Sequence, residues 1–157
     1  MVRNLTRVDC LSREYPTHPF VGVGAIIMRD GKILLVKRGS KPGRNKWSIP
    51  GGLIELGEKV RDTVVREVKE ETNLDVEVHS LIDVVDNLIT DEKGRWQFHF
   101  IILDFFTRLK GGSLNAKSDV LEVRWVPLNK VEKYELTVVF RDFFEKNREK
   151  LQHFDSS

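Results

Sequence analysis

The stretch GLIELGEKVRDTVVREVKEETNL, residues 52–74, places three glutamates close together after a glycine-rich loop. If residues 59–72 form a helix, Glu67, Glu70 and Glu71 fall at positions i, i+3 and i+4, on one face near its C-terminal end. Like charges so spaced repel one another, and they lie at the unfavourable end of the helix dipole. A bound cation would reverse both penalties, and oxygen-only ligands suit a hard divalent ion such as Mg²⁺ or Mn²⁺.

The same segment carries an apolar stripe at helical spacing, which predicts a buried face. The stripe consists of Val60, Val64, Val65 and Val68. The basic residues expected to face water are Lys59, Arg61 and Lys69. Taken alone, an acidic and basic run of this kind also fits a solvated helix face without a function. The spacing of its fixed positions decides against that alternative.

This spacing resembles the signature of the Nudix hydrolase family, GX5EX7REUXEEXGU, in which U is an aliphatic residue. The positions that match in register are Gly52, Glu58, Arg66, Glu67, Val68, Glu70, Glu71 and Leu74. The one departure is Asn73, where the signature has glycine. That position lies just past the expected helix end, where a left-handed backbone is common and asparagine is the next best residue. The departure therefore removes no metal ligand.

The resemblance implies an α/β fold, namely an α/β/α sandwich with a mixed sheet, in which the signature forms a catalytic loop, helix, loop unit. Arg66 and Glu58 are implied to hold the loop and the helix together. The ligands that the resemblance implies for Mg²⁺, or for Mn²⁺ in its place, are Glu67, Glu70, Glu71 and the carbonyl oxygen of Gly51.

The implied reaction is metal-dependent hydrolysis of the diphosphate linkage in a nucleoside diphosphate joined to another group. A carboxylate would take the proton of the attacking water. The resemblance leaves this base open between Glu67 or Glu70 in the signature and an acid from a later loop. We favour Asp119, which ends the glycine- and serine-containing loop 111–118. The other downstream candidates are Asp91, Glu92 and Glu122.

The residues that bind substrate are less sharply marked, because the signature is shared by enzymes for many nucleotides. Phosphates need cations, and a base needs an aromatic or apolar slot. We predict contacts from Arg38, Arg44, Phe20 and Trp96. Further candidates are Lys41, Phe98, His99 and Phe100. Of these, His99 fits a structural role better, since it alternates with two phenylalanines along a strand.

ADP-ribose or a related nucleotide sugar is the favoured substrate, because the chain's size and its segment DEKGRWQFHF, residues 91–100, resemble small hydrolases of that class. Against this, many ADP-ribose pyrophosphatases carry a proline that would fall near Thr90, and the chain has none between Pro50 and Pro127. A nucleoside triphosphate pyrophosphohydrolase that releases a nucleoside monophosphate and pyrophosphate is the alternative. A nucleotide-binding regulator without turnover is a third alternative, disfavoured because all three acids are retained.

Length and charge predict one domain spanning residues 1–157, with residues 1–16 as an extended lead-in. The formal net charge of +2 supplies no strong field for nucleic acid. The apolar runs are too short to span a membrane. The single cysteine, Cys10, excludes an intrachain disulfide and favours the cytoplasm. We therefore expect a small nucleotide as partner, and a homodimer as the assembly.

The rest of the chain predicts alternating strands and helices. The expected strands are residues 21–28 and 32–37, joined by a hairpin turn, then 74–85, 96–109 and 121–126. The expected helical segments after the signature are a short turn from Pro127 and a closing helix over residues 137–151. The apolar stretch 100–106 fits either the core or a dimer face.

Overall fold

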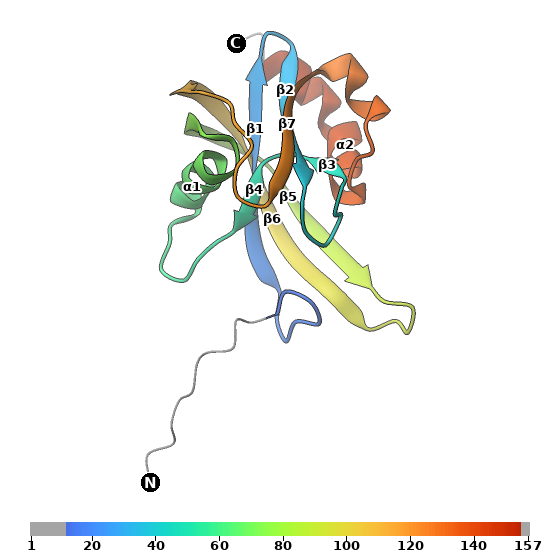
Figure 1. The fold of residues 1–157 in the computed structure, drawn as a ribbon. Helices are drawn as coiled ribbons and strands as arrows, with labels where there is room; N and C mark the ends of the chain where they lie inside the picture. The colour runs from blue at the N-terminus through green and yellow to red at the C-terminus, as the bar shows by residue number, and fades with distance from the viewer. Residues whose placement is uncertain (1–11, 155–157) are drawn as a thin grey trace.

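Residues 12–154 are described by a computed structural model, in which one sheet lies between two long helices (Figure 1). The elements in chain order are β1 Phe20–Arg29, β2 Lys32–Arg38, β3 Trp47–Ser48, β4 Gly51–Leu53, α1 Val60–Thr72, β5 Leu74–Thr90, β6 Trp96–Gly112, β7 Val120–Pro127, the 3-10 helix η1 Leu128–Lys133, and α2 Val138–Phe154.

The sheet has seven strands, in the spatial order β3-β2-β1-β6-β5, with β4 paired to β1 and β7 paired to β2. Strands β1 and β6 run parallel, and the other strand pairs are antiparallel. Helix α1 covers one face and α2 the other (Figure 1). The expected α/β/α sandwich with a mixed sheet is therefore confirmed.

Strand β1 lies at the centre of the sheet and is buried on both faces. Successive side chains of a strand point to opposite faces. Accordingly, Val23 and Ile27 pack with Val64 of α1, whereas Ile26 packs with Phe144 of α2. This apolar strand explains why two cores form, one on each side of the sheet.

Helix α1 begins and ends close to the expected bounds of residues 59–72. Asn73 takes the left-handed conformation with φ 62°, and its N–H donates to the carbonyl of Lys69. Val65 corrects the predicted stripe, because it is 41% exposed. It lies one residue, about 100°, around the helix from the buried Val64 and faces water. The basic residues Lys59, Arg61 and Lys69 are exposed, as expected.

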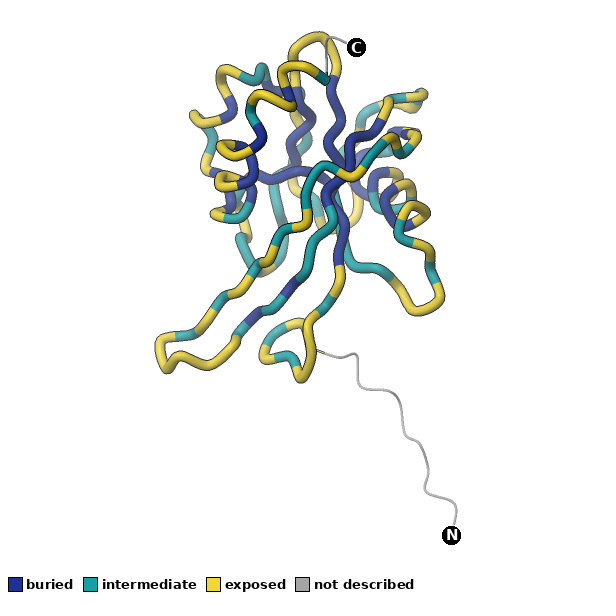
Figure 2. The backbone as a smooth tube through the Cα atoms, turned by 180° about the vertical axis from the view of Figure 1, so that it is seen from behind, coloured by how far each residue is buried: buried dark blue, intermediate teal, exposed yellow. Residues whose placement is uncertain are grey.

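Strands β5 and β6 form a hairpin longer than predicted, because both strands continue past Val85 and Leu109. Their ladder runs from Leu74 opposite Gly112 to Thr90 opposite Trp96. The tip of this hairpin is exposed and projects from the body (Figure 2). The phenylalanines within the stretch 100–106 are buried, so that stretch contributes to the core.

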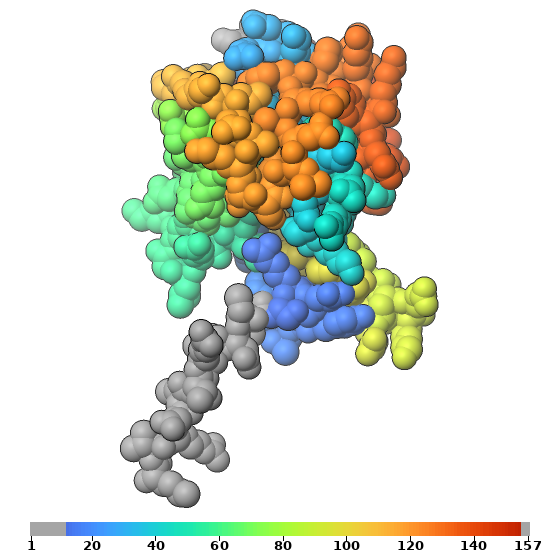
Figure 3. All heavy atoms as spheres, in the orientation of Figure 1, coloured from blue at the N-terminus to red at the C-terminus, as the bar shows by residue number. Residues whose placement is uncertain are grey.

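Within the expected lead-in, residues 13–15 form bends that lie against the hairpin (Figure 3). The Tyr15 N–H donates to the Gln97 carbonyl at 2.8 Å, and the Gln97 side chain donates to Glu14 at 2.6 Å. Hydrogen bonds to a strand that is distant in sequence hold this segment, and no local sequence pattern predicts them. The rest of the lead-in and Cys10 lie outside the described residues.

The closing elements agree with the expected order, with a short helical turn after Pro127 and a final helix. That helix, α2, extends to Phe154 and buries three phenylalanines against the sheet. Within residues 12–154, no helix has the length and apolar character needed to cross a membrane.

Candidate active site

Two glycines let β4 approach α1 on one side and β1 on the other. A side chain at Gly52 would overlap the carboxylate of Glu67, and one at Gly51 would overlap the carbonyl oxygen of Val23. The Gly51 N–H donates a 3.1 Å hydrogen bond to Oε2 of Glu71. Glycine is therefore required here for close packing, and the loop backbone faces the carboxylates at the end of the helix.

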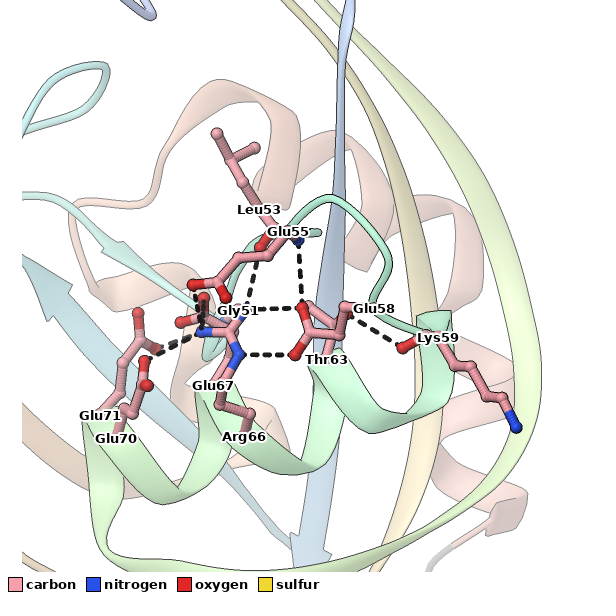
Figure 4. A network of polar contacts seen from close by, with 10 residues as sticks. All are labelled: Gly51, Leu53, Glu55, Glu58, Lys59, Thr63, Arg66, Glu67, Glu70 and Glu71. Carbon is pink, nitrogen blue, oxygen red and sulfur yellow. Dashed lines mark hydrogen bonds and ion pairs between the residues drawn. The ribbon is translucent and has the colours of Figure 1, made fainter. Parts of the chain in front are cut away.

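Arg66 is the hub of the polar network between the loop and α1 (Figure 4). Its Nε and Nη2 donate to the two carboxylate oxygens of Glu58, at 2.6 and 2.9 Å, and Nη2 also donates to the Leu53 carbonyl at 3.1 Å. Its Nη1 donates to Glu67 at 2.9 Å and to Glu70 at 3.1 Å. One guanidinium thus ties the loop to the helix and orients two of the three clustered acids.

The pair of Glu58 and Arg66 shifts both titrations. The hydrogen bond from Arg66 lowers the pKa of Glu58 to about 2, and the hydrogen bond to Glu58 raises the pKa of Arg66. Both groups stay charged across the physiological range. Their geometry is that of residues that hold the loop and the helix together.

Burial and mutual repulsion disfavour the charged form of two of the remaining acids. Glu71 is 8% exposed, and burial raises its pKa to about 8, with further contributions from Glu67 and Asp119. Burial also raises the pKa of Glu67, against the lowering effect of Arg66. The side chain of Glu70 is 51% exposed. The site therefore gathers more carboxylates than the nearby cations balance.

The clustered carboxylates are the candidate ligands for a divalent cation. Among residues 12–154, no group of three acidic, cysteine or histidine side chains already stands arranged around a cation position. Arg66 accounts for this, because its guanidinium binds the carboxylates of Glu67 and Glu70 as a metal cation otherwise would. The donors are nevertheless all oxygen, from three carboxylates and the Gly51 carbonyl, and they fit a hard divalent ion once those two side chains turn toward it.

The loop that follows β6 is docked on the end of α1. The Asn73 side chain donates to the Ser113 carbonyl at 2.8 Å and accepts from Lys117 Nζ at 3.1 Å. The Lys117 N–H donates to the carbonyl of Glu71 at 3.0 Å. These contacts bring Asp119 close enough for its charge to act on the buried glutamates.

A cleft of about 800 Å³ joins these groups. Its charged part is lined by Glu67, Glu70, Glu71, Asp119, Arg38 and Lys41. Burial lowers the pKa of Arg38, although Glu71 and Asp119 act in the opposite direction. Its Nε donates to the Pro42 carbonyl at 2.7 Å. The cleft thus places cations beside the carboxylates, as binding of a phosphorylated ligand requires.

Other predicted residues lie away from the cleft lining. Arg44 is exposed in its loop, and Phe20 packs against Phe100 at 6.3 Å between ring centroids. Trp96 is 56% exposed, because β6 begins out in the projecting hairpin. Of the wider aromatic set, Phe100 lines the cleft, whereas Phe98 and His99 do not.

The alternative acids are occupied elsewhere. Asp91 closes the hairpin turn with Arg95 and accepts from Tyr15. Glu92 is exposed at that turn, and Glu122 accepts from Lys37 at 3.3 Å. None of these three acids lines the cleft.

Sequence reasoning missed Asp104, Arg13, Lys46 and Ser118, which also line the cleft. For Asp104 a signal was present, because it is the one charged residue in the apolar run FIILDFF, residues 100–106. A lone acid in such a strand requires an explanation.

Residues 18–146 of the chain match the model of the protein family described as NUDIX domain. A segment of the chain is 41% identical over 116 residues to the ADP-ribose pyrophosphatase of Methanocaldococcus jannaschii, covering 74% of this chain and 66% of that protein. The chain thus spans slightly less than two thirds of this relative's length.

Solved structures agree in fold. The MutT NUDIX hydrolase from Burkholderia pseudomallei is 31% identical, with a TM-score of 0.71 over 82% of this chain and 97% of that one. The NUDIX domain of Shewanella oneidensis NrtR, complexed with ADP ribose, is 26% identical, with a TM-score of 0.68 over 85% of this chain and 89% of that one.

Proposed function

Because this chain belongs to the Nudix hydrolase family, we propose that it hydrolyses the diphosphate linkage of a nucleoside diphosphate joined to another group, with ADP-ribose or a related nucleotide sugar as substrate. The observation that carries the proposal is the meeting, in one cleft, of the three clustered glutamates with Arg38 and Lys41. The choice of ADP-ribose is supported by the M. jannaschii relative and by the ADP ribose complex of the S. oneidensis domain.

The residues that would hold the metal are Glu67, Glu70, Glu71 and the carbonyl oxygen of Gly51. We propose Mg²⁺, for which Mn²⁺ can substitute. When bound, the cation supplies neutralisation of charge on the phosphate oxygens and a water of lowered pKa. Arg66 orients two of these glutamates through its Nη1 and is itself fixed by Glu58.

The remaining work falls to residues around the diphosphate. Arg38 and Lys41 bind its oxygens and hold it in the cleft. Asp119 accepts the proton of the attacking water as general base. The Ser40 hydroxyl donates to Asp119 Oδ2 at 3.0 Å and holds this carboxylate beside the cleft.

Product analysis tests this proposal. The protein is incubated with Mg²⁺ and ADP-ribose, other nucleotide sugars, dinucleoside polyphosphates, or nucleoside triphosphates, at equal concentration. AMP with ribose 5-phosphate as products is the expected result. Absence of turnover for all of them, with Mg²⁺ or Mn²⁺, would overturn the proposed activity.

A nucleoside triphosphate pyrophosphohydrolase is the second candidate. It is favoured by the 31% identity to the MutT protein of B. pseudomallei and by the absence of proline near Thr90. In the same assay this activity would release a nucleoside monophosphate and pyrophosphate.

We also propose a homodimer in the cytoplasm. Exposed apolar side chains on β5, namely Leu81, Val84 and Leu88, support the dimer, and the single cysteine agrees with a reducing compartment. Light scattering tests the first statement and cell fractionation the second.

A further inference from the structure

One buried acid in the cleft has no part in the proposed hydrolysis. Asp104 is 4% exposed and lies on β6, where it is in register with Gly24 of β1 on one side and with Asp83 of β5 on the other. It also lines the cleft. Burial raises its pKa to about 7, with a further contribution from Asp83. A carboxyl held at this position is costly to the fold and calls for a role.

The neighbouring acid shows what a structural role looks like in this molecule. Asp83 receives hydrogen bonds from Lys146 Nζ and Asn147 Nδ2 of α2, both at 3.1 Å. The carboxylate of Asp104, in contrast, makes no hydrogen bond or ion pair with any other residue in the range 12–154. The hydrogen-bonding capacity of its carboxylate is therefore left for a ligand in the cleft.

The chain keeps space for this carboxylate. A side chain at Gly24 would collide with Asp104 Oδ1 and would lie 2.8 Å from Ile49. Gly24 is also paired with Gly51 on its other side, so Asp104 and Gly51 flank it. Because β1 lies between them, the backbones of Asp104 and Gly51 are two strand spacings, roughly 10 Å, apart. Asp104 is thus removed from the proposed cation site by a distance that a nucleoside can span.

Asp104 belongs to an otherwise apolar wall of the cleft. Apart from Asp104, the lining residues of β6 and α2 are all apolar, among them Phe100 and Ile102 of β6 with Phe140 and Phe143 of α2. An apolar slot with one hydrogen-bonding group is the usual form of a site for a flat organic ring. A carboxylate at such a slot accepts from an N–H donor and disfavours a carbonyl oxygen.

We propose that Asp104 recognises the nucleobase and accepts a hydrogen bond from its exocyclic amino group, so that the cleft selects adenine over hypoxanthine. This inference rests on the proposed function, because it assumes a substrate with a nucleoside diphosphate. Asp104 determines specificity, and the groups that act on the diphosphate are separate from it.

The test compares ADP-ribose with IDP-ribose. The base of ADP-ribose carries an amino group at the position where the base of IDP-ribose carries a carbonyl group. We expect the wild-type protein to prefer ADP-ribose by about 10- to 100-fold in kcat/KM. Asp104→Asn should bring this ratio close to one, mainly through KM, because an amide can serve either base. Asp86→Asn is the matched control, since that acid is exposed on β5 and lies outside the cleft lining, and it should keep the wild-type ratio.

The outcomes separate this inference from the hydrolysis itself. Turnover of both substrates with equal kcat/KM, or an unchanged ratio in Asp104→Asn, would overturn base recognition and leave the hydrolase in place. If Asp104→Asn instead changes the preference for ADP-ribose over 2′-deoxy-ADP-ribose, Asp104 contacts a ribose hydroxyl and the base assignment is overturned. If no substrate is turned over, the Kd values of AMP and IMP decide, and equal values overturn the inference.

Discussion

The two parts of the cleft are built in opposite ways. At the carboxylate cluster, Arg66 donates to Glu58, Glu67 and Glu70, and the charges are held by many short hydrogen bonds. At the other part, the Asp104 carboxylate is buried without such a bond, on a wall of the cleft where the other lining residues of β6 and α2 are apolar. The first part comes from one continuous segment, and the second from three strands and a helix that are distant in sequence. The proposed reaction chemistry is thus held by local contacts, whereas the proposed ligand selection depends on long-range packing.

The largest expected effect is at the carboxylate cluster. Glu70→Gln should lower kcat/KM with Mg²⁺ by about 100-fold or more, on the scale of removing one electrostatic group from an active site. Glu77→Gln is the control, because Glu77 is an exposed glutamate of β5 that pairs with Lys110. Steady-state rates measure both variants. A loss in Glu70→Gln no larger than in Glu77→Gln would remove this acid from the proposed chemistry.

The next effect concerns the hub of that cluster. Arg66→Lys should destabilise the fold by roughly 2 kcal/mol, because a lysine cannot replace the paired donation to Glu58 together with the bond to Leu53. Urea denaturation measures the change. Arg95→Lys, which alters the exposed pair with Asp91, should cost clearly less than Arg66→Lys. Equal costs would show that the hub is no stronger than a surface pair.

A smaller effect is expected at the end of α1. Asn73→Ala should cost about 1 to 2 kcal/mol, because alanine tolerates the left-handed conformation poorly and makes neither side-chain bond. Asn73→Gly should be close to neutral, since the relaxed backbone offsets the lost bonds. Thermal unfolding compares the two variants. A cost for glycine as large as that for alanine would place the whole contribution in the side-chain bonds.

The smallest effect is a pH dependence. The folded pKa of Glu58, about 2, lies below its ordinary value of 4.5, so its contribution to stability is fully present above pH 4.5. That contribution is lost as the pH falls from about 4.5 to 2, because the carboxylate is protonated and releases Arg66. Urea midpoints measured across this window should fall less for Glu58→Gln than for the wild type. Parallel curves would contradict the assignment.

The sequence predicted what depends on local spacing. Helix α1 and its left-handed end at Asn73 lie within one 23-residue segment and follow from its periodicity and end residue. The contact between Arg66 and Glu58 in the same segment was implied by the family resemblance. The α/β/α sandwich also followed, because the resemblance brought a whole fold with it.

What the sequence did not predict depends on pairing between distant strands. Asp104 meets Gly24 only because β1 and β6 run parallel, and no local pattern encodes that register. The same holds for Trp96, which the long hairpin carries away from the cleft, and for Tyr15, which folds back onto β6. The predicted burial of Val65 was wrong for a different reason, because an apolar residue next to a buried stripe can still face water.

The loop that carries Asp119 has a consequence for motion. Because the Lys117 amide donates to the last turn of α1, its proton can exchange with solvent only when that bond opens. The loop and the helix end should therefore exchange at matched rates, as one cooperative unit. Loops at functional sites usually belong to the least protected part of a protein, whereas this loop should open only as often as the helix end to which it is bonded.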